Sequence, residues 1–477
     1  MKIAVIGAGP AGITAAYLIS KEIPGGKVAD LDVYEAGDQV GGLAKSILLW
    51  NQKVDMGPHR FFSHDKLVNQ LWLEVVGSNY RMVNRNTRIY YKKKFFDYPL
   101  KPANALYNLG LWEATRCMMS YMKEKILPTS DTGTFESWVT RRFGKRLFQI
   151  FFKTYSEKLW GIKCTELDSD FASQRIKRLS LYEAVKNALL KGRRNVHKTL
   201  VDQFAYPTGG TGFVYESMAS AITKNGGKIF LKTAVEKVLT SKGKATGIQL
   251  ENGETRDYDH IISTMPISLL VSRMPGIPEN IRQLAESLKF RNTILVYLNV
   301  NHPDLFPDQW LYIHSEDLQM GRMTNFRNWI PELFGEEKNT ILCLEYWCNF
   351  GDPVWQMGDV EIIKTASKET NLTGLLHQGE VTDGYVLRIP RCYPIYFKNY
   401  KKILSPIQEY LDQIDCLQVI GRYGSYKYNN QDHSIFMGIL AAENAVAGKN
   451  NNLWDINTDY DTYQESSVIR ETGLVEV

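Results

Sequence analysis

The sequence has few cysteines and none in a paired motif. Its 477 residues contain six of them, at positions 117, 164, 343, 348, 392 and 416, with no CxxC pair and no zinc-type spacing. A chain of this size needs no disulfide framework to support its core. We therefore expect reduced thiols in a cytoplasmic protein, and we predict no metal site.

Long apolar runs and basic blocks are also absent. The stretch most like a signal peptide, "IAVIGAGPAGITAAYLIS", follows a single lysine and is interrupted by glycines and a proline. Nothing else approaches the ~20 uninterrupted apolar residues of a membrane-spanning helix. The 57 Lys+Arg and 52 Asp+Glu leave a net charge of only +5. We expect a soluble protein without stable membrane insertion, whose partner is an anionic small molecule rather than nucleic acid.

The amino terminus contains a dinucleotide-binding pattern. "KIAVIGAGPAGITAAYLIS" predicts a strand, a turn with Gly7, Gly9 and Gly12, and a helix, and "LDVYEA" predicts a second strand ending at Glu35. These glycines allow a tight turn and bring the backbone close to a pyrophosphate at the helix start. The acid is placed to accept hydrogen bonds from a ribose. Glycine-rich helix starts also arise from packing, but the whole strand, turn, helix, strand and acid pattern favours a dinucleotide.

A second glycine pair favours FAD over NAD. Gly41 and Gly42 in "EAGDQVGGLAKS" follow the acid and form another loop of bare backbone that can approach a phosphate. A simple surface turn would also use these residues. Taken with the features below, we predict FAD.

Length and hydrophobic periodicity predict several domains and an α/β fold. Helical spacing after residue 101 indicates a helical insert, and alternating patterns from residue 290 indicate an antiparallel β-sheet substrate domain. The remaining chain forms a discontinuous Rossmann-type FAD-binding domain, and the tail is expected to be dispensable. The predicted boundaries are 1–101, 197–289 and 401–455 for the FAD-binding domain, 102–196 for the helical insert, 290–400 for the β-sheet domain and 456–477 for the tail.

One polar and aromatic stretch near the end, "GRYGSYKYNNQDHS" at residues 421–434, fits neither a core strand nor an ordinary helix. Gly421 and Gly424 would let the backbone approach a flavin. The following "DHSIFMGILAAENAV" predicts a helix capped by Asp432 or Ser434.

The order of these motifs resembles the UDP-galactopyranose mutase family, and most closely its longer eukaryotic-type branch. The resemblance covers nearly the whole chain and rests on "GPHRFFSHDK", "TYSEKLWG", "YPTGGTG", "ISTMP", "WLYIHSED" and "GRYGSYKYNNQDHS". It implies a flavoenzyme that interconverts pyranose and furanose forms of a nucleotide sugar for polysaccharide or glycan synthesis. In that chemistry N5 of reduced FAD attacks the anomeric carbon and expels the nucleoside diphosphate, and NADH or NADPH can serve as the reductant.

The departing diphosphate gains negative charge, so arginine forks and phenol donors stabilise the transition state. An arbitrary arginine more often forms a surface ion pair, but motif matching assigns catalytic roles to His59, Arg322 and Arg422. The substrate-binding positions implied by the resemblance are Trp160, Arg175, Tyr312, Arg322, Tyr393, Arg422, Tyr428 and Asn430. The cofactor-binding positions are Gly7, Gly9, Gly12, Glu35, Gly42, Arg88, Val235, Gly421, Asn430, Gln431 and Ser434.

The sequence departs from the family near the sugar site. The asparagine expected before "GGTG" is replaced by the stretch "LVDQFAYPTGG", and the spacing between Tyr428 and Asn430 is shortened. The nucleotide, UDP or dTDP, and the sugar, galactose or 6-deoxygalactose (fucose), therefore stay open. Helical inserts in this family carry oligomer contacts, which allows a homo-oligomer without setting its size.

Two other functions compete with the mutase. The leading alternative is an FAD-dependent oxidoreductase similar to protoporphyrinogen oxidase or the amine oxidases, whose site would be an apolar slot with few arginines. A non-catalytic flavin-binding scaffold would leave the substrate-side motifs unexplained.

Overall fold

A five-stranded parallel sheet forms the centre of the predicted FAD-binding region, with a hydrophobic cluster on each face. The computed structural model describes residues 1–98, 100–176, 203–376, 379–456 and 467–476. The strand order is β19-β13-β1-β2-β9, and every neighbouring pair is parallel. The strands are β1 (Lys2–Ile6), β2 (Asp30–Tyr34), β9 (Lys228–Phe230), β13 (His260–Ser263) and β19 (Leu417–Val419). Their apolar runs are buried on both faces, as parallel strands require.

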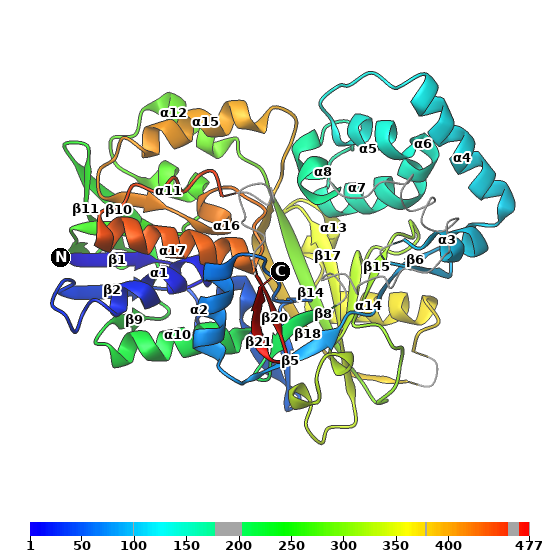
Figure 1. The fold of residues 1–477 in the computed structure, drawn as a ribbon, viewed down its shortest axis with the longest axis horizontal. Helices are drawn as coiled ribbons and strands as arrows, with labels where there is room; N and C mark the ends of the chain where they lie inside the picture. The colour runs from blue at the N-terminus through cyan, green and yellow to red at the C-terminus, as the bar shows by residue number, and fades with distance from the viewer. Residues whose placement is uncertain (99, 177–202, 377–378, 457–466, 477) are drawn as a thin grey trace.

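Helices cover one face of this sheet, and a mixed layer covers the other (Figure 1). The first layer contains α1 (Pro10–Ser20), α2 (Lys66–Val76), α10 (Gly212–Lys224) and α17 (Gln431–Ala447). A Cβ at Gly438 would lie 2.6 Å from the carbonyl oxygen of Ala11, so α17 packs directly on α1. The second layer contains β10 (Val235–Ser241), β11 (Lys244–Leu250), β12 (Thr255–Asp257), α11 (Ile267–Arg273), α12 (Glu279–Glu286) and α15 (Tyr400–Leu411).

A separate sheet has seven strands, in the order β18-β14-β17-β16-β15-β6-β7. Its strands are β6 (Thr87–Tyr91), β7 (Lys94–Asp97), β14 (Phe290–Val300), β15 (Trp310–Ile313), β16 (Arg322–Asn325), β17 (Thr340–Cys348) and β18 (Val381–Pro394), and α14 (Asp359–Leu372) packs on one face. The α/β fold with an antiparallel β-sheet region is confirmed. One difference is that the β6–β7 hairpin, predicted within residues 1–101, joins this sheet through β15. The hairpin covers a strand edge that would otherwise stay unpaired.

The predicted helical region is present from residue 102 to residue 176. It contains α3 (Pro102–Leu109), α4 (Leu111–Ile126), α5 (Phe135–Phe143), α6 (Lys145–Leu147), a π-helical turn (Phe148–Lys153), α7 (Thr154–Trp160) and α8 (Ser169–Ile176). Its core packs against Trp347 and Tyr393 of the seven-stranded sheet. The predicted helix "SLYEAVKNALLKG" lies outside the described residues. Within the part of the chain that the structure describes, no helix has the length and apolar character needed to cross a membrane.

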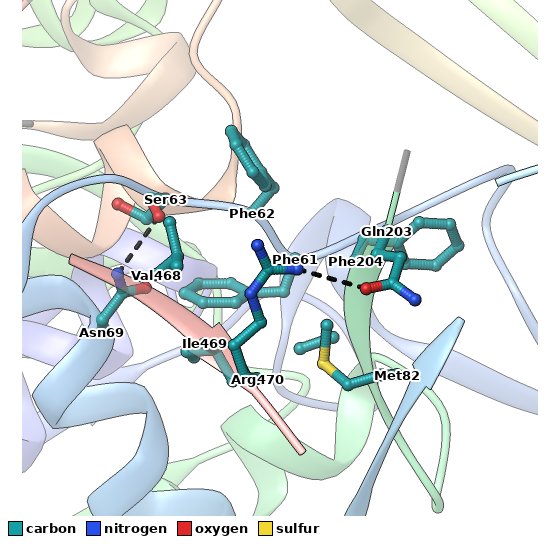
Figure 2. A pocket seen from close by; sticks show the side chains of 11 residues that line it. Phe61, Phe62, Ser63, Asn69, Met82, Gln203, Phe204, Val468, Ile469 and Arg470 are labelled. Carbon is teal, nitrogen blue, oxygen red and sulfur yellow. Dashed lines mark hydrogen bonds between the residues drawn. The ribbon is translucent and has the colours of Figure 1, made fainter. Parts of the chain in front are cut away.

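The described part of the carboxyl-terminal tail, which the sequence predicts to be dispensable, packs against the rest of the protein. Its hairpin of β20 (Ser467–Arg470) and β21 (Gly473–Glu476) closes a small cavity beside β5 (Tyr80–Asn84) and β8 (Gln203–Pro207) (Figure 2). Buried Asn69 donates from Nδ2 to the Ser467 carbonyl (3.2 Å) and Oγ (3.1 Å), and to the carbonyl of Ser63 (3.1 Å). None of the predicted site residues lines this cavity.

Asn69→Ala is expected to lower the free energy of unfolding by about 1–3 kcal/mol, because it leaves buried carbonyls without a donor. Asn371→Ala is the matched control, since this exposed asparagine donates only to a carbonyl of its own helix; its effect should stay within about 0.5 kcal/mol. Urea denaturation measures both variants. Equal stability of Asn69→Ala and wild type would show that the tail contributes nothing here.

Candidate functional site

The predicted glycines form a bare backbone cradle at the start of α1. Gly12 approaches Gly7 so closely that a Cβ on Gly12 would lie 2.0 Å from the Gly7 carbonyl oxygen. A Cβ on Gly42 would lie 3.0 Å from the Cα of Gly9, so the two glycine loops meet. Gly9 is the N-cap of α1 and provides no side-chain cap. The helix start therefore suits a pyrophosphate, which can accept from its backbone N–H groups.

Glu35 connects the loops around this cradle. Its Oε2 accepts from the N–H of Ala8 (2.8 Å) and its Oε1 from the N–H of Gly37 (2.8 Å). The Glu35 carbonyl accepts from the N–H of Thr233 (2.9 Å), two residues before buried Val235 at the start of β10. Glu35 and Val235, both predicted cofactor contacts, thus border the same side of the cradle.

A second helix start lies beside α1. Helix α17 begins at Gln431 with Asn430 as its N-cap, and no side chain caps it. The predicted caps Asp432 and Ser434 are wrong: the backbone is already extended at Asn430 (φ −85°, ψ −179°), so the helix begins earlier and both residues lie inside it. Gln431 is buried, and its Oε1 accepts from the hydroxyl of Tyr215 (2.7 Å).

Gly421, at φ +83°, begins the short helix α16 (Gly421–Gly424). A Cβ there would lie 3.3 Å from the Cβ of Ala11 in α1. The starts of α1 and α16 therefore lie close together, α17 packs on α1 through Gly438, and no side chain caps any of the three helix starts. This arrangement fits two parts of an FAD molecule: its pyrophosphate at α1 and the polar edge of its flavin ring at α17.

Arg322 has a partly buried guanidinium that one carboxylate holds in place. It lies on β16, opposite Glu345 of β17 in the strand register. Its Nε and Nη2 donate to the two carboxylate oxygens at 2.5 and 2.6 Å, a bidentate pair that fixes the plane of the guanidinium. Glu345 is only 2% exposed. Sequence reasoning missed Glu345, because a glutamate within an apolar strand has no motif of its own.

Arg422 is partly buried and lies beside two tyrosine rings that stack on each other. Its guanidinium lies 4.7 Å from the ring centre of Tyr393 and 4.5 Å from that of Tyr428, and these two rings stack at 5.5 Å. Its Nε and Nη1 donate to the carbonyls of Cys392 (3.2 Å) and Asn429 (3.0 Å). Among the described residues Arg422 has no ion-pair partner. The aromatic faces and carbonyls hold the cation without neutralising it.

The two arginines share their neighbours. Both interact electrostatically with Tyr393 and with His59. Burial, followed by the charge of Arg322 and then that of Arg422, lowers the pKa of His59 to about 4, so the imidazole is neutral at physiological pH. Its Nε2 lies 3.0 Å from the Met56 carbonyl, which assigns the proton to Nε2 and leaves Nδ1 as an acceptor. The site thus carries two guanidiniums, one carboxylate and a neutral histidine.

Aromatic side chains of the helical region pack against the tyrosines beside these arginines. Trp160 is fully buried on α7, and its ring centre lies 5.6 Å from that of Tyr428 and 6.2 Å from that of Tyr393. Tyr155, on the same helix, lies between Tyr312 (5.7 Å) and Trp347 (5.5 Å). Sequence reasoning did not single out Tyr155, although it stands in "TYSEKLWG". Burial raises the pKa of its phenol, which therefore stays protonated.

Lys158 anchors α7 over the site. Its Nζ lies within hydrogen-bond distance of the carbonyls of Ile313 (3.2 Å), Ser315 (3.0 Å), Leu318 (2.8 Å) and Met320 (3.1 Å). Burial lowers its pKa to about 8. The carbonyls belong to the last residue of β15 and to the segment between β15 and β16, so this contact ties the helical region to the sheet that carries Tyr312 and Arg322.

Asp55 holds the loop that carries His59. Its buried carboxylate accepts from Ser46 Oγ (2.5 Å), Tyr206 OH (2.7 Å) and both the N–H (3.1 Å) and Oγ1 (2.7 Å) of Thr211. The same hydroxyl of Thr211 lies 3.0 Å from the His59 carbonyl. Sequence reasoning treated "GPHRFFSHDK" and "YPTGGTG" as separate motifs and missed that Asp55, just before the first, joins them in one network.

Of the two remaining predicted residues, Arg88 is not brought into this cluster, and the side chain of Arg175 is not described. Arg88 donates from Nε and Nη2 to fully buried Asp308 at 2.8 and 2.6 Å. In the register it lies opposite Leu311, whereas its neighbour Ile89 lies opposite Tyr312, so Arg88 is on the other face of the sheet. Arg175 falls in α8, and its side chain lies outside the described part. The described residues contain no cluster of three or more potential metal ligands.

Comparisons with known proteins agree on the flavin-binding architecture. The family profile described as "Flavin containing amine oxidoreductase" matches residues 10–357. A structure of reduced UDP-galactopyranose mutase superposes with a TM-score of 0.82 at 24% identity, over 94% of this chain and 96% of that one. A structure named as a candidate protoporphyrinogen oxidase from Exiguobacterium sp. 255-15 gives a TM-score of 0.72 at 14% identity, over 94% and 99% of the two chains.

A relative found by sequence has an oxidase name. Coproporphyrinogen III oxidase of Bacillus subtilis (strain 168) is 25% identical over 299 residues, which are 58% of this chain. The match spans 62% of the length of that relative. The structural likenesses show the fold, and the profile covers more than half of the chain. The chain therefore belongs to the flavin-containing amine oxidoreductase family and is an FAD-dependent enzyme.

Proposed function

We propose that the protein is a nucleotide-sugar mutase that interconverts the pyranose and furanose forms of a nucleoside-diphosphate sugar. The observation that carries this proposal is the unbalanced positive charge of the site: the partly buried Arg322 and Arg422 share His59 and Tyr393 as neighbours, and Glu345 is their one ion-pair partner among the described residues. A cation that is partly removed from water and has no counter-ion is costly, so the site favours an anion. The neighbouring phenols are donors that suit phosphate oxygens.

The two arginines would hold the diphosphate both while it leaves the sugar and until it returns. With Nε and Nη2 of Arg322 bound to Glu345, its Nη1 remains to face a ligand, and Arg422 uses only Nε and Nη1 on protein carbonyls. These cations, held in place before the substrate arrives, lower the barrier because negative charge grows on the diphosphate as the bond to the sugar breaks. They then keep the diphosphate close for its return.

Bound reduced FAD supplies a nucleophile for the anomeric carbon. The glycine cradle and Glu35 would hold the dinucleotide, and the start of α17 would orient the flavin. His59 is neutral, so it adds no further positive charge, and its Nδ1 offers an acceptor for a sugar hydroxyl. Trp160 and Tyr155, on α7, would exclude water from the reacting carbon.

A porphyrinogen oxidase is the second candidate, because the Bacillus subtilis relative carries that name. A carboxylate-bearing substrate would also meet the two guanidiniums. A cationic amine, in contrast, would be repelled by the uncompensated charge at Arg422. Because one fold can serve several activities, the choice between the mutase and the oxidase depends on the site residues and on an activity assay.

The purified protein is expected to contain FAD and, after reduction with dithionite or NAD(P)H, to convert a UDP- or dTDP-furanose into its pyranose. The oxidised protein should be inactive on the same sugars. Chromatography of the nucleotide sugars measures the conversion across a small panel of donors. Consumption of oxygen with coproporphyrinogen or an amine, without conversion of any nucleotide sugar, would contradict the mutase.

Arg422→Ala is expected to lower kcat/KM for the nucleotide sugar by on the order of a hundredfold, about 3 kcal/mol, because it removes a cation aimed at the leaving group. Bound flavin, measured by absorbance, should be retained. Arg388→Ala is the control: this arginine pairs with Asp359 away from the site and should leave kcat/KM unchanged. Loss of flavin from Arg422→Ala would make the residue a cofactor ligand instead.

Stability should fall at acid pH because of His59. The pKa of His59 is about 4 in the folded protein and 6.5 when exposed, so unfolding takes up a proton between these values. The stabilisation is present above pH 6.5 and is lost as pH falls toward 4, which predicts a loss of about 2 kcal/mol from pH 7 to pH 5. His59→Gln keeps a donor near Met56 and should reduce this loss, measured by urea denaturation at both pH values. An unchanged pH dependence would place His59 in solvent. His260 and His314, whose pKa values are also lowered, contribute equally in both proteins.

A further inference from the structure

The helical region exposes an apolar surface that the proposed function does not use. We define the α3–α4 surface by its nine exposed large apolar residues: Leu106, Tyr107, Leu111, Trp112, Met118, Met119, Met122, Ile126 and Leu127. Trp112 is 75% and Ile126 72% exposed. Single exposed apolar side chains are ordinary, but a group of this size on two consecutive helices marks an interaction surface. Figure 1 shows α3 and α4 at the edge of the molecule, on the side away from α1 and β1.

The exposed charges on this surface are all positive. Arg116, Lys123 and Lys125 are exposed on α4. The two acids of α4 are not exposed. Glu113 pairs with Arg146 and with Arg116, and buried Glu124 accepts from the N–H (2.8 Å) and Oγ1 (2.9 Å) of Thr129. The surface is therefore apolar and basic.

The tip of the β6–β7 hairpin extends this charge. Lys92 and Lys93 form the turn and are exposed. The hairpin is fixed to α3, because Lys94 Nζ donates to the carbonyl of Asn108 (2.6 Å) and Asn108 Nδ2 donates to the carbonyl of Phe95 (2.9 Å). Both lysines thus lie beside the start of the α3–α4 surface.

We propose that the α3–α4 surface binds the surface of an anionic lipid bilayer. A helix with Trp, Leu, Met and Ile on its exposed side and Lys and Arg beside them lies in the membrane interface and is attracted to acidic headgroups. Helix α4 has 16 residues, or ~24 Å at 1.5 Å per residue, shorter than the ~30 Å hydrocarbon core, so it would lie on the bilayer. A symmetric contact with a second copy would bring the same cations together, which disfavours that occupant.

The test is sedimentation of the FAD-loaded protein with vesicles that contain phosphatidylglycerol, compared with vesicles of phosphatidylcholine alone. The wild type is expected to bind the acidic vesicles at least tenfold more tightly, with an affinity that falls as salt rises. Trp112→Ser with Ile126→Ser, and separately Lys123→Glu with Lys125→Glu, should each weaken binding at least tenfold. Val360→Ser is the matched control, because Val360 is 84% exposed on α14 and should leave binding unchanged.

Circular dichroism and bound flavin establish that each variant is folded. Absence of vesicle binding by the wild type, or undiminished binding by folded Trp112→Ser with Ile126→Ser, would overturn the proposal. Light scattering measures the oligomeric state. If the wild type is a dimer that does not bind lipid, and Trp112→Ser with Ile126→Ser makes it a monomer, the α3–α4 surface binds a second copy of the chain instead. The result is independent of the mutase assay.

Discussion

The chemistry of the site depends on keeping Arg422 charged where it is partly removed from water. Burial alone penalises a cation, and the carbonyls of Cys392 and Asn429 with the faces of Tyr393 and Tyr428 offset this penalty without adding a negative charge. A carboxylate in their place, as Glu345 is for Arg322, would satisfy the charge inside the protein. The absence of such a partner among the described residues is what leaves a net attraction for an anionic ligand.

The rest of the structure brings these groups together from distant parts of the chain. Arg422 comes from α16, which follows the last strand of the parallel sheet, Arg322 from the second sheet, and Trp160 and Tyr155 from the helical region. Lys158 ties the helical region to the sheet, and Asp55 ties the His59 loop to the start of α10. Each tie is a polar contact within an apolar core, where a misplaced partner is costly. The site therefore acts as the meeting point of all three structural regions.

Family membership and fold leave several reactions open, because mutases and oxidases share this architecture. What separates them lies in a few side chains around the flavin position. The glycine cradle and Glu35 serve any FAD enzyme, whereas the pair of partly buried arginines with their tyrosines suits a substrate that carries concentrated negative charge. The mutase proposal thus rests on the second set, and the cofactor on the first.

Local pattern by itself determined the flavin-binding start, the helical region and the strands of the second sheet. Glycine spacing and hydrophobic periodicity depend only on near neighbours, so Gly7, Gly9, Gly12 and Glu35 were readable from the sequence. Contacts between distant segments were not. The pairing of Arg322 with Glu345, the placement of Arg88 on the opposite sheet face and the packing of the tail against Asn69 were decided by strand register and long-range contacts. A strand pattern shows which residues share a face, but only the folded sheet shows which face the substrate would meet and which charges are left without partners.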